Sequence, residues 1–160
     1  MNSVKLTGVL LVLSAVTLAL MIPGGFVETR SFARYPIWVL GAFNVVLTVL
    51  GLGSLVLAYR IFSTGYVTVL ASITGFGFVC VYGLDLLHVF PISDNPMSFS
   101  LYALEWLGTL LGLLLAGVAW NAINGDYRLE PSAARLPAWG LVVLGLMTVV
   151  VVVFATWFAR

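Results

Sequence analysis

The sequence predicts an all-α integral membrane protein, a bundle of five transmembrane helices joined by short loops. Two features of the composition lead to this prediction: 62% of the 160 residues are hydrophobic and only 8% are charged. About a quarter of the residues in a soluble domain are charged, so this chain lacks the polar groups that would cover a soluble surface. The third feature is that the apolar residues form five long runs.

Each run is long enough to cross a bilayer, because a spanning helix needs roughly 20 mostly apolar residues. The first run ends at Pro23, and the second begins at Pro36. The third ends before Pro91, the fourth ends before Gly125, and the fifth follows Pro137. Proline and glycine are typical of such breaks. The predicted spans are residues 3–22, 36–59, 66–90, 99–121 and 138–158, and together they form one transmembrane domain, residues 1–160.

The charges indicate the partners and the orientation. The net charge is only +1 and the chain has no basic run, which argues against a nucleic-acid partner. We expect contact with the lipid bilayer, and association with a protein partner or with a second copy in the membrane. Four basic residues fall on the amino-terminal side and three on the other, namely Lys5, Arg60, Arg128 and Arg135 against Arg30, Arg34 and Arg160. The positive-inside rule then predicts a cytoplasmic amino terminus, in the plasma (inner) membrane.

Three acidic or histidine residues lie inside the predicted spans, where each costs a few kcal/mol and normally faces the bundle interior. They are Asp85 and His88 in the third span and Glu105 in the fourth. The short connection 91–98 makes these two helices an antiparallel hairpin. At equal depth, Asp85 should lie opposite Glu105, and His88 opposite Tyr102. The sequence therefore predicts a polar cluster near one end of the bundle.

Other polar residues are expected to join this cluster. Tyr82 lies one helical turn before Asp85, and Asn44 of the second span lies at a similar depth. The loop between the first two spans emerges at the same end with three charged residues, Glu28, Arg30 and Arg34. The forked guanidinium of an arginine matches a carboxylate well and could pair with Asp85 or Glu105.

Small residues follow Glu105 at helical spacing. Gly108, Gly112 and Ala116 form a stripe that allows close helix approach. Because Glu105 heads this stripe and is costly in lipid, we expect the stripe to pack inside the monomer. The fifth span is expected to be peripheral, since its valine run 149–153 has no polar contact to offer.

Four interpretations of the cluster remain open. It could be structural, with the side chains satisfying one another, or it could bind a small polar molecule, a lipid headgroup or a quinone. Asp85, His88 and Glu105 are also plausible ligands for zinc or iron, although no fourth ligand is identified. The carboxylates could instead move protons or ions.

The catalytic motifs HExxH, GxSxG, CxxC and the P-loop are absent. A single histidine rules out bis-histidine haem within one chain, and no cofactor can be identified. We expect a small accessory or binding subunit of a membrane complex, with its polar pocket at the exoplasmic end. The alternative is a small membrane enzyme or proton-coupled transporter that uses Asp85, His88 and Glu105 directly.

Overall fold

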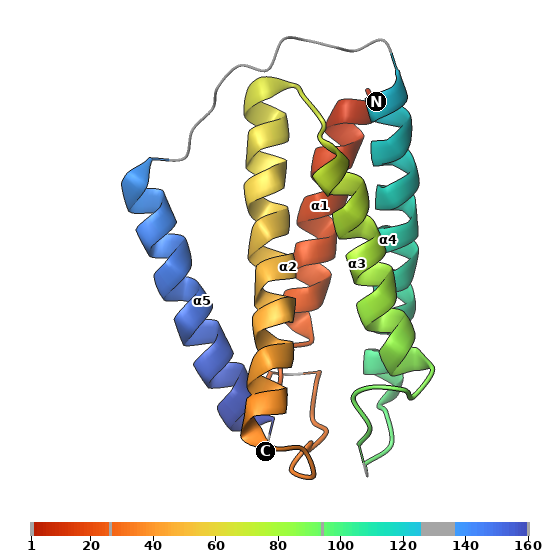
Figure 1. Cartoon of the computed structure of the whole chain (residues 1–160). Coiled ribbons are helices and arrows are strands. Elements are labelled where there is room, and N and C mark those ends of the chain that lie inside the picture. The colour runs from red at the N-terminus through yellow and green to blue at the C-terminus, as the bar shows by residue number, and fades with distance from the viewer. Residues whose placement is uncertain (1, 26, 94, 126–136, 160) are drawn as a thin grey trace.

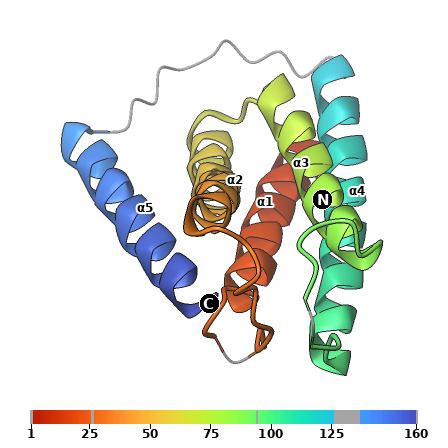
Figure 2. The ribbon, with the colours of Figure 1, turned by 60° about the horizontal axis from the view of Figure 1, so that its bottom comes forward.

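The computed structural model describes residues 2–25, 27–93, 95–125 and 137–159, and this part of the chain folds into five helices (Figures 1 and 2). The helices are α1 (Ser3–Leu20), α2 (Ile37–Thr64), α3 (Val69–Leu86), α4 (Phe99–Asn124) and α5 (Ala138–Phe158). Each is long and apolar enough to cross a membrane. The described residues thus contain the predicted number and order of long apolar helices, as expected of a multi-pass membrane protein.

Two helices run past their predicted ends, and two stop short; α1 ends at Leu20, two residues before its predicted end. α2 continues to Thr64 and ends where Gly65 adopts a left-handed conformation with φ 69°, which glycine enters without steric cost. The Gly65 N–H donates to the Ile61 carbonyl over 2.8 Å and closes the last turn. α4 continues to Asn124, whereas α3 ends at Leu86, four residues before its predicted end.

α3 and α4 pack against each other through their small residues. A Cβ atom on Gly112 would lie 2.9 Å from the Gly75 carbonyl oxygen, and one on Gly75 would lie 2.6 Å from the Ala116 nitrogen. The Ser72 hydroxyl uses this close approach to donate to the Ala116 carbonyl over 3.1 Å. The expected packing of the small-residue stripe inside the monomer, against the third or the second helix, is confirmed, and the partner is the third helix.

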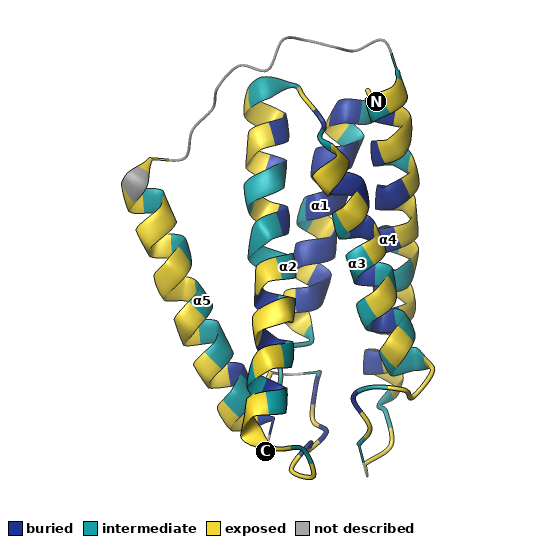
Figure 3. Ribbon diagram, in the orientation of Figure 1, coloured by how far each residue is buried: buried dark blue, intermediate teal, exposed yellow. Residues whose placement is uncertain are grey.

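α1 to α4 share one apolar core, whereas α5 is peripheral. Among the described helices, α5 packs against α2 alone, and most of its surface is exposed (Figure 3). Two hydrogen bonds hold its carboxyl-terminal end: Asn44 Nδ2 donates to Thr156 Oγ1 over 3.1 Å, and the Phe32 N–H donates to the Ala159 carbonyl over 2.8 Å. The expected peripheral position of the fifth helix is confirmed, and its polar contact comes from Thr156, which follows the valine run by about one turn.

The chain between α1 and α2 crosses the end of the bundle where α3 ends and α4 begins (Figure 1). Phe32 of this segment is buried with Leu40 of α2 and Ala159 beyond α5 in a small second apolar cluster. Tyr35 packs edge-on against Phe90, and its hydroxyl accepts a hydrogen bond from the Ile92 N–H. The segment is thereby held against the neighbouring α3–α4 loop.

Candidate intramembrane polar site

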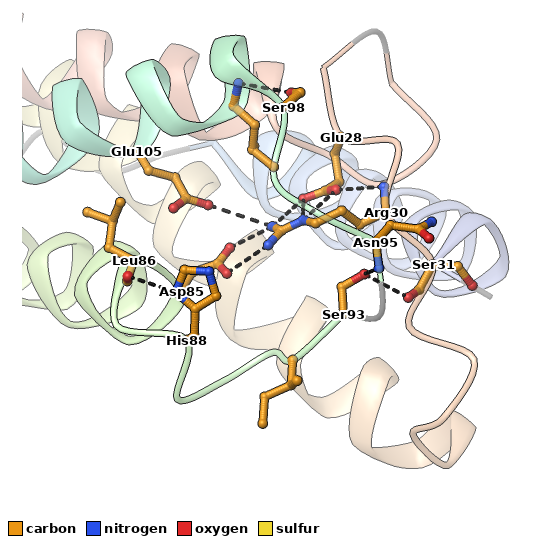
Figure 4. Close-up of polar contacts among 12 residues, drawn as sticks. Glu28, Arg30, Ser31, Asp85, Leu86, His88, Ser93, Asn95, Ser98 and Glu105 are labelled. Carbon is orange, nitrogen blue, oxygen red and sulfur yellow. Dashed lines mark hydrogen bonds and ion pairs between the residues drawn. The ribbon is translucent and has the colours of Figure 1, made fainter.

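One arginine organises the polar end of the bundle. Arg30 comes from the α1–α2 loop, is only 7% exposed, and points back under α3 and α4 (Figure 4). Its Nη1 and Nη2 atoms donate to the two carboxylate oxygens of Asp85 over 2.9 and 2.7 Å. This is the bidentate geometry in which a planar guanidinium binds a carboxylate most strongly. The expectation that a loop arginine pairs with Asp85 is confirmed.

A second carboxylate of the same loop satisfies the other edge of the guanidinium. Glu28 is 5% exposed and accepts from Arg30 Nε over 3.0 Å and from Nη2 over 2.7 Å. It also accepts from the Arg30 backbone N–H over 3.0 Å, which fixes the turn that carries the arginine. Burial lowers the pKa of Arg30, but the hydrogen bonds to Asp85 and Glu28 raise it more, so the net direction is upward and the guanidinium stays charged.

Glu105 is the least satisfied member of this group. Its side chain is fully buried, and Oε1 lies 3.7 Å from Arg30 Nη2, within ion-pair distance. Neither carboxylate oxygen has a hydrogen-bond partner among the described residues. Asp85 and Glu105 thus approach the same guanidinium nitrogen, and the juxtaposition predicted from the antiparallel hairpin is confirmed.

His88 lies outside α3, and its predicted place in the cluster is wrong. The helix ends in a Schellman motif: the His88 N–H donates to the Asp85 carbonyl over 2.8 Å, and the Val89 N–H donates to the Leu84 carbonyl over 2.9 Å. His88 occupies the left-handed position of this motif with φ 55°. Its side chain is exposed, and Nδ1 lies 3.0 Å from the Leu86 carbonyl oxygen (Figure 4).

The remaining predicted site residues divide into two groups. Tyr82 does lie beside the carboxylates: it is 1% exposed and its hydroxyl has no hydrogen-bond partner within the described chain. Tyr102 is 45% exposed and packs edge-on against Trp106, so its predicted place opposite His88 in the cluster is wrong. Asn44 is buried but bonds to α5 rather than joining the cluster, and Arg34 is exposed in its loop.

The three-ligand metal site predicted from Asp85, His88 and Glu105 is not formed. Within residues 2–25, 27–93, 95–125 and 137–159, no group of three or more histidine, cysteine or carboxylate side chains is placed to hold a metal ion. The physical reason lies in the helix ending, which moves His88 off the face that carries Asp85. The two carboxylates of the hairpin face a guanidinium instead.

Two cavities adjoin the site. The smaller has a volume of about 50 Å³ and is lined by Tyr82, Asp85 and Glu105 together with the loop residues Glu28 and Arg30. It is polar at this end and apolar at the other, where Leu18, Met21, Pro23 and Leu47 complete the wall.

The larger cavity has a volume of about 330 Å³ and lies between α1, α2 and α5. Its wall is mainly apolar and includes Leu18, Leu55 and Val151. Two polar residues, Asn44 and Thr48, also line it. The sequence reasoning missed this cavity. An apolar residue that lines a cavity has the same sequence signature as one that faces lipid, so no signal in the sequence distinguishes the two.

Five helices that are long and apolar enough to cross a membrane, held together at one end by a buried arginine, are typical of a polytopic α-helical membrane protein. The chain belongs to the family described as a domain of unknown function, DUF8051, whose model matches residues 3–135. This match includes α1 to α4 and ends before α5. No curated protein matches the chain, and no solved structure matches it.

Proposed function

We propose that this chain is a small binding protein of the membrane, an accessory subunit that holds the apolar part of a membrane amphiphile between α1, α2 and α5. The cavity of about 330 Å³ is the observation that carries the proposal. Sites for small molecules are typically cavities of roughly 300–1,000 Å³ with mainly apolar walls and a few polar groups. This cavity has that size and that composition, and it lies between helices that are apolar enough to span a bilayer.

The polar network supports a structural role for most of its charges. Glu28 and Asp85 occupy the hydrogen-bonding edges of Arg30, so these three side chains satisfy one another. A network of this kind fixes the loop against the helix ends and leaves no activated nucleophile. It fits a binding protein better than an enzyme.

One observation favours the alternative of a proton-coupled transporter or membrane enzyme. The oxygens of Glu105 are fully buried and have no hydrogen-bond partner among the described residues, and intramembrane carboxylates occur along proton paths. The two functions differ in their response to Glu105→Gln. In a binding protein this variant can change only the occupancy of the cavities, whereas in a transporter or enzyme it abolishes turnover.

We also propose a cytoplasmic amino terminus in the plasma (inner) membrane, which puts the polar end on the exoplasmic side. Arg30 is buried against carboxylates, so it adds little free positive charge to that side. Single cysteines at the exposed positions Ser63 and Asn95, with Cys80→Ala, test the orientation. An impermeant thiol reagent added outside the cell should label Asn95→Cys only, and labelling of Ser63→Cys alone would reverse the assignment.

The binding proposal is tested by filling the cavity. Val151 lines it from α5, so Val151→Trp should displace the occupant. Val150 is 66% exposed on the same helix and does not line the cavity, so Val150→Trp is the matched control. The protein is purified in a mild detergent, and the bound lipophilic molecules are counted and identified by native mass spectrometry.

We expect wild type and Val150→Trp to retain a bound lipophilic molecule, and Val151→Trp to lose at least ~10-fold in occupancy, about 1.4 kcal/mol of binding. Equal occupancy in the two variants, or a wild-type protein that carries nothing, would contradict the proposal.

A further inference from the structure

The smaller cavity contains unsatisfied buried oxygens that all accept hydrogen bonds. Glu105 is 0% exposed and Tyr82 is 1% exposed, both line the cavity, and Glu105 Oε1 and Oε2 and Tyr82 Oη have no hydrogen-bond partner among the described residues. A buried polar atom without a partner costs about 1–3 kcal/mol, more when the group is charged. The Tyr82 hydroxyl can donate one hydrogen bond itself, and a ligand that donates further hydrogen bonds would satisfy the remaining acceptors.

The charges at the cavity select the kind of donor. Glu28 and Asp85 share the single positive charge of Arg30, which leaves one negative charge in excess before Glu105 is counted. Coulomb attraction in such a poorly solvated place favours a cation over a neutral group and repels an anion. The donors of Arg30 already face Glu28 and Asp85, so the arginine offers little to an anionic headgroup.

The volume sets a limit on the size of the donor. About 50 Å³ holds roughly three water molecules, which is enough for an ammonium group and the first methylene attached to it. A phosphodiester or a quinone ring is too large. The same limit excludes a trimethylammonium group, which also has no N–H to donate.

The two cavities are neighbours. Leu18, Met21, Pro23 and Leu47 line both, so these four residues form the wall between the polar and the apolar space. Met21 has an unbranched side chain and lies at the end of α1, where a change of rotamer can open the wall. A molecule with a small polar head and a hydrocarbon chain then fits both spaces at once.

We propose that the smaller cavity binds the protonated primary amine of a long-chain amphiphile, with its N–H groups donating to Glu105 and Tyr82 and its hydrocarbon chain in the larger cavity. This inference rests on the proposed function and names the ligand class. Neither cavity is sufficient alone: the larger one supplies apolar contact, and the smaller one supplies selectivity for the head.

The test uses four probes with the same chain length: dodecylamine, 1-dodecanol, dodecyltrimethylammonium and dodecanoate. Each is titrated into the full-length protein in a non-ionic detergent, and bound probe is measured by native mass spectrometry. We expect dodecylamine to bind at least ~10-fold more tightly than each of the others, as charge-assisted hydrogen bonds imply. Equal affinities, the result for a cavity that holds only water, overturn the inference, and so does a preference for the alcohol.

Two variants examine the head site. Glu105→Gln replaces the carboxyl group by an amide at nearly constant shape and should reduce the preference for amine over alcohol about 10-fold. Tyr82→Phe removes one hydroxyl and should reduce this preference by a smaller factor. It replaces Glu105→Gln as the test if Glu105→Gln does not fold. A preference for the amine that survives both substitutions overturns the inference.

Val151→Trp separates this inference from the proposed function. It should weaken all four probes to a similar extent, because it fills the space for the shared chain. If Val151→Trp weakens every probe but the amine has no advantage in wild type, the binding function stands and the amine site fails. If Val151→Trp weakens none, both fail.

Discussion

At the scale of single residues, the polar end depends on the different geometries of its charged side chains. Arg30 can serve two carboxylates at once because its five N–H donors lie in one plane, and Asp85 and Glu28 lie at two edges of that plane. Glu105 receives only the more distant approach of 3.7 Å. The difference explains why the first two carboxylates hold the loop and the third remains available to a ligand.

His88 allows a direct test of the helix ending. An L residue in the left-handed conformation is strained by roughly 1–2 kcal/mol, and glycine is not. His88→Gly should therefore stabilise the protein by about 1 kcal/mol, which thermal unfolding in detergent can measure. Leu87→Gly, at the neighbouring exposed position with an ordinary φ of −81°, should instead destabilise it. Loss of stability in His88→Gly would contradict the capping role.

The residues also show how far the sequence could lead. The closeness of Asp85 and Glu105 could be predicted from the short hairpin, because an antiparallel hairpin fixes which residues of the two helices lie at the same depth. The position of His88 could not be predicted, because the apolar run continues past Leu86 and gives no sign that the helix ends there. The partner of Asn44 was also out of reach: Thr156 lies 112 residues away, and no local pattern connects the two.

At the scale of the elements, the α3–α4 pair is the rigid part of the bundle. The Tyr82 ring lies over Gly108, and the backbones of the two helices approach each other where Gly75 faces Gly112 and Ala116. Membrane helices gain little from apolarity against one another, and close approach supplies the attraction. The Gly108, Gly112 and Ala116 spacing is a strong pattern, which is why the sequence could predict this seam but left its partner open between the third and the second helix.

Gly112→Ala should destabilise the monomer. The new Cβ would lie 2.9 Å from the Gly75 carbonyl oxygen and 3.0 Å from a Val79 methyl, and overpacking of this kind typically costs about 1–3 kcal/mol. Gly117 lies on the same helix with nothing within 4 Å of its Cβ position, so Gly117→Ala is the control. It should be neutral or stabilising, because alanine favours the helix by up to about 1 kcal/mol.

Thermal unfolding of both variants, with the oligomeric state measured alongside, decides the question. If Gly112→Ala melts like wild type but a dimer disappears, the seam lies between chains instead of within one.

At the scale of the whole molecule, a fastened polar end coexists with a loosely packed side. The α1–α2 loop, α3 and α4 meet at Arg30. By contrast, α5 is held to α2 and to the loop near its carboxyl-terminal end, and it diverges from the bundle towards its amino-terminal end (Figure 1). The larger cavity lies in the space that this divergence leaves between α1, α2 and α5. The binding proposal thus depends on the network, because the same loop forms the end wall of both cavities.

Arg30→Lys tests this dependence most directly. A lysine keeps the charge but is a single point donor, so it cannot bind Asp85 and Glu28 along two edges, and a buried carboxylate is left without its partner. We expect the free energy of unfolding, measured by thermal unfolding, to fall by at least ~2 kcal/mol, and the occupant of the larger cavity to bind more weakly. Arg34→Lys, at an exposed position of the same loop, should melt like wild type. If Arg30→Lys also melts like wild type, the buried arginine does not fasten the polar end, and the account fails.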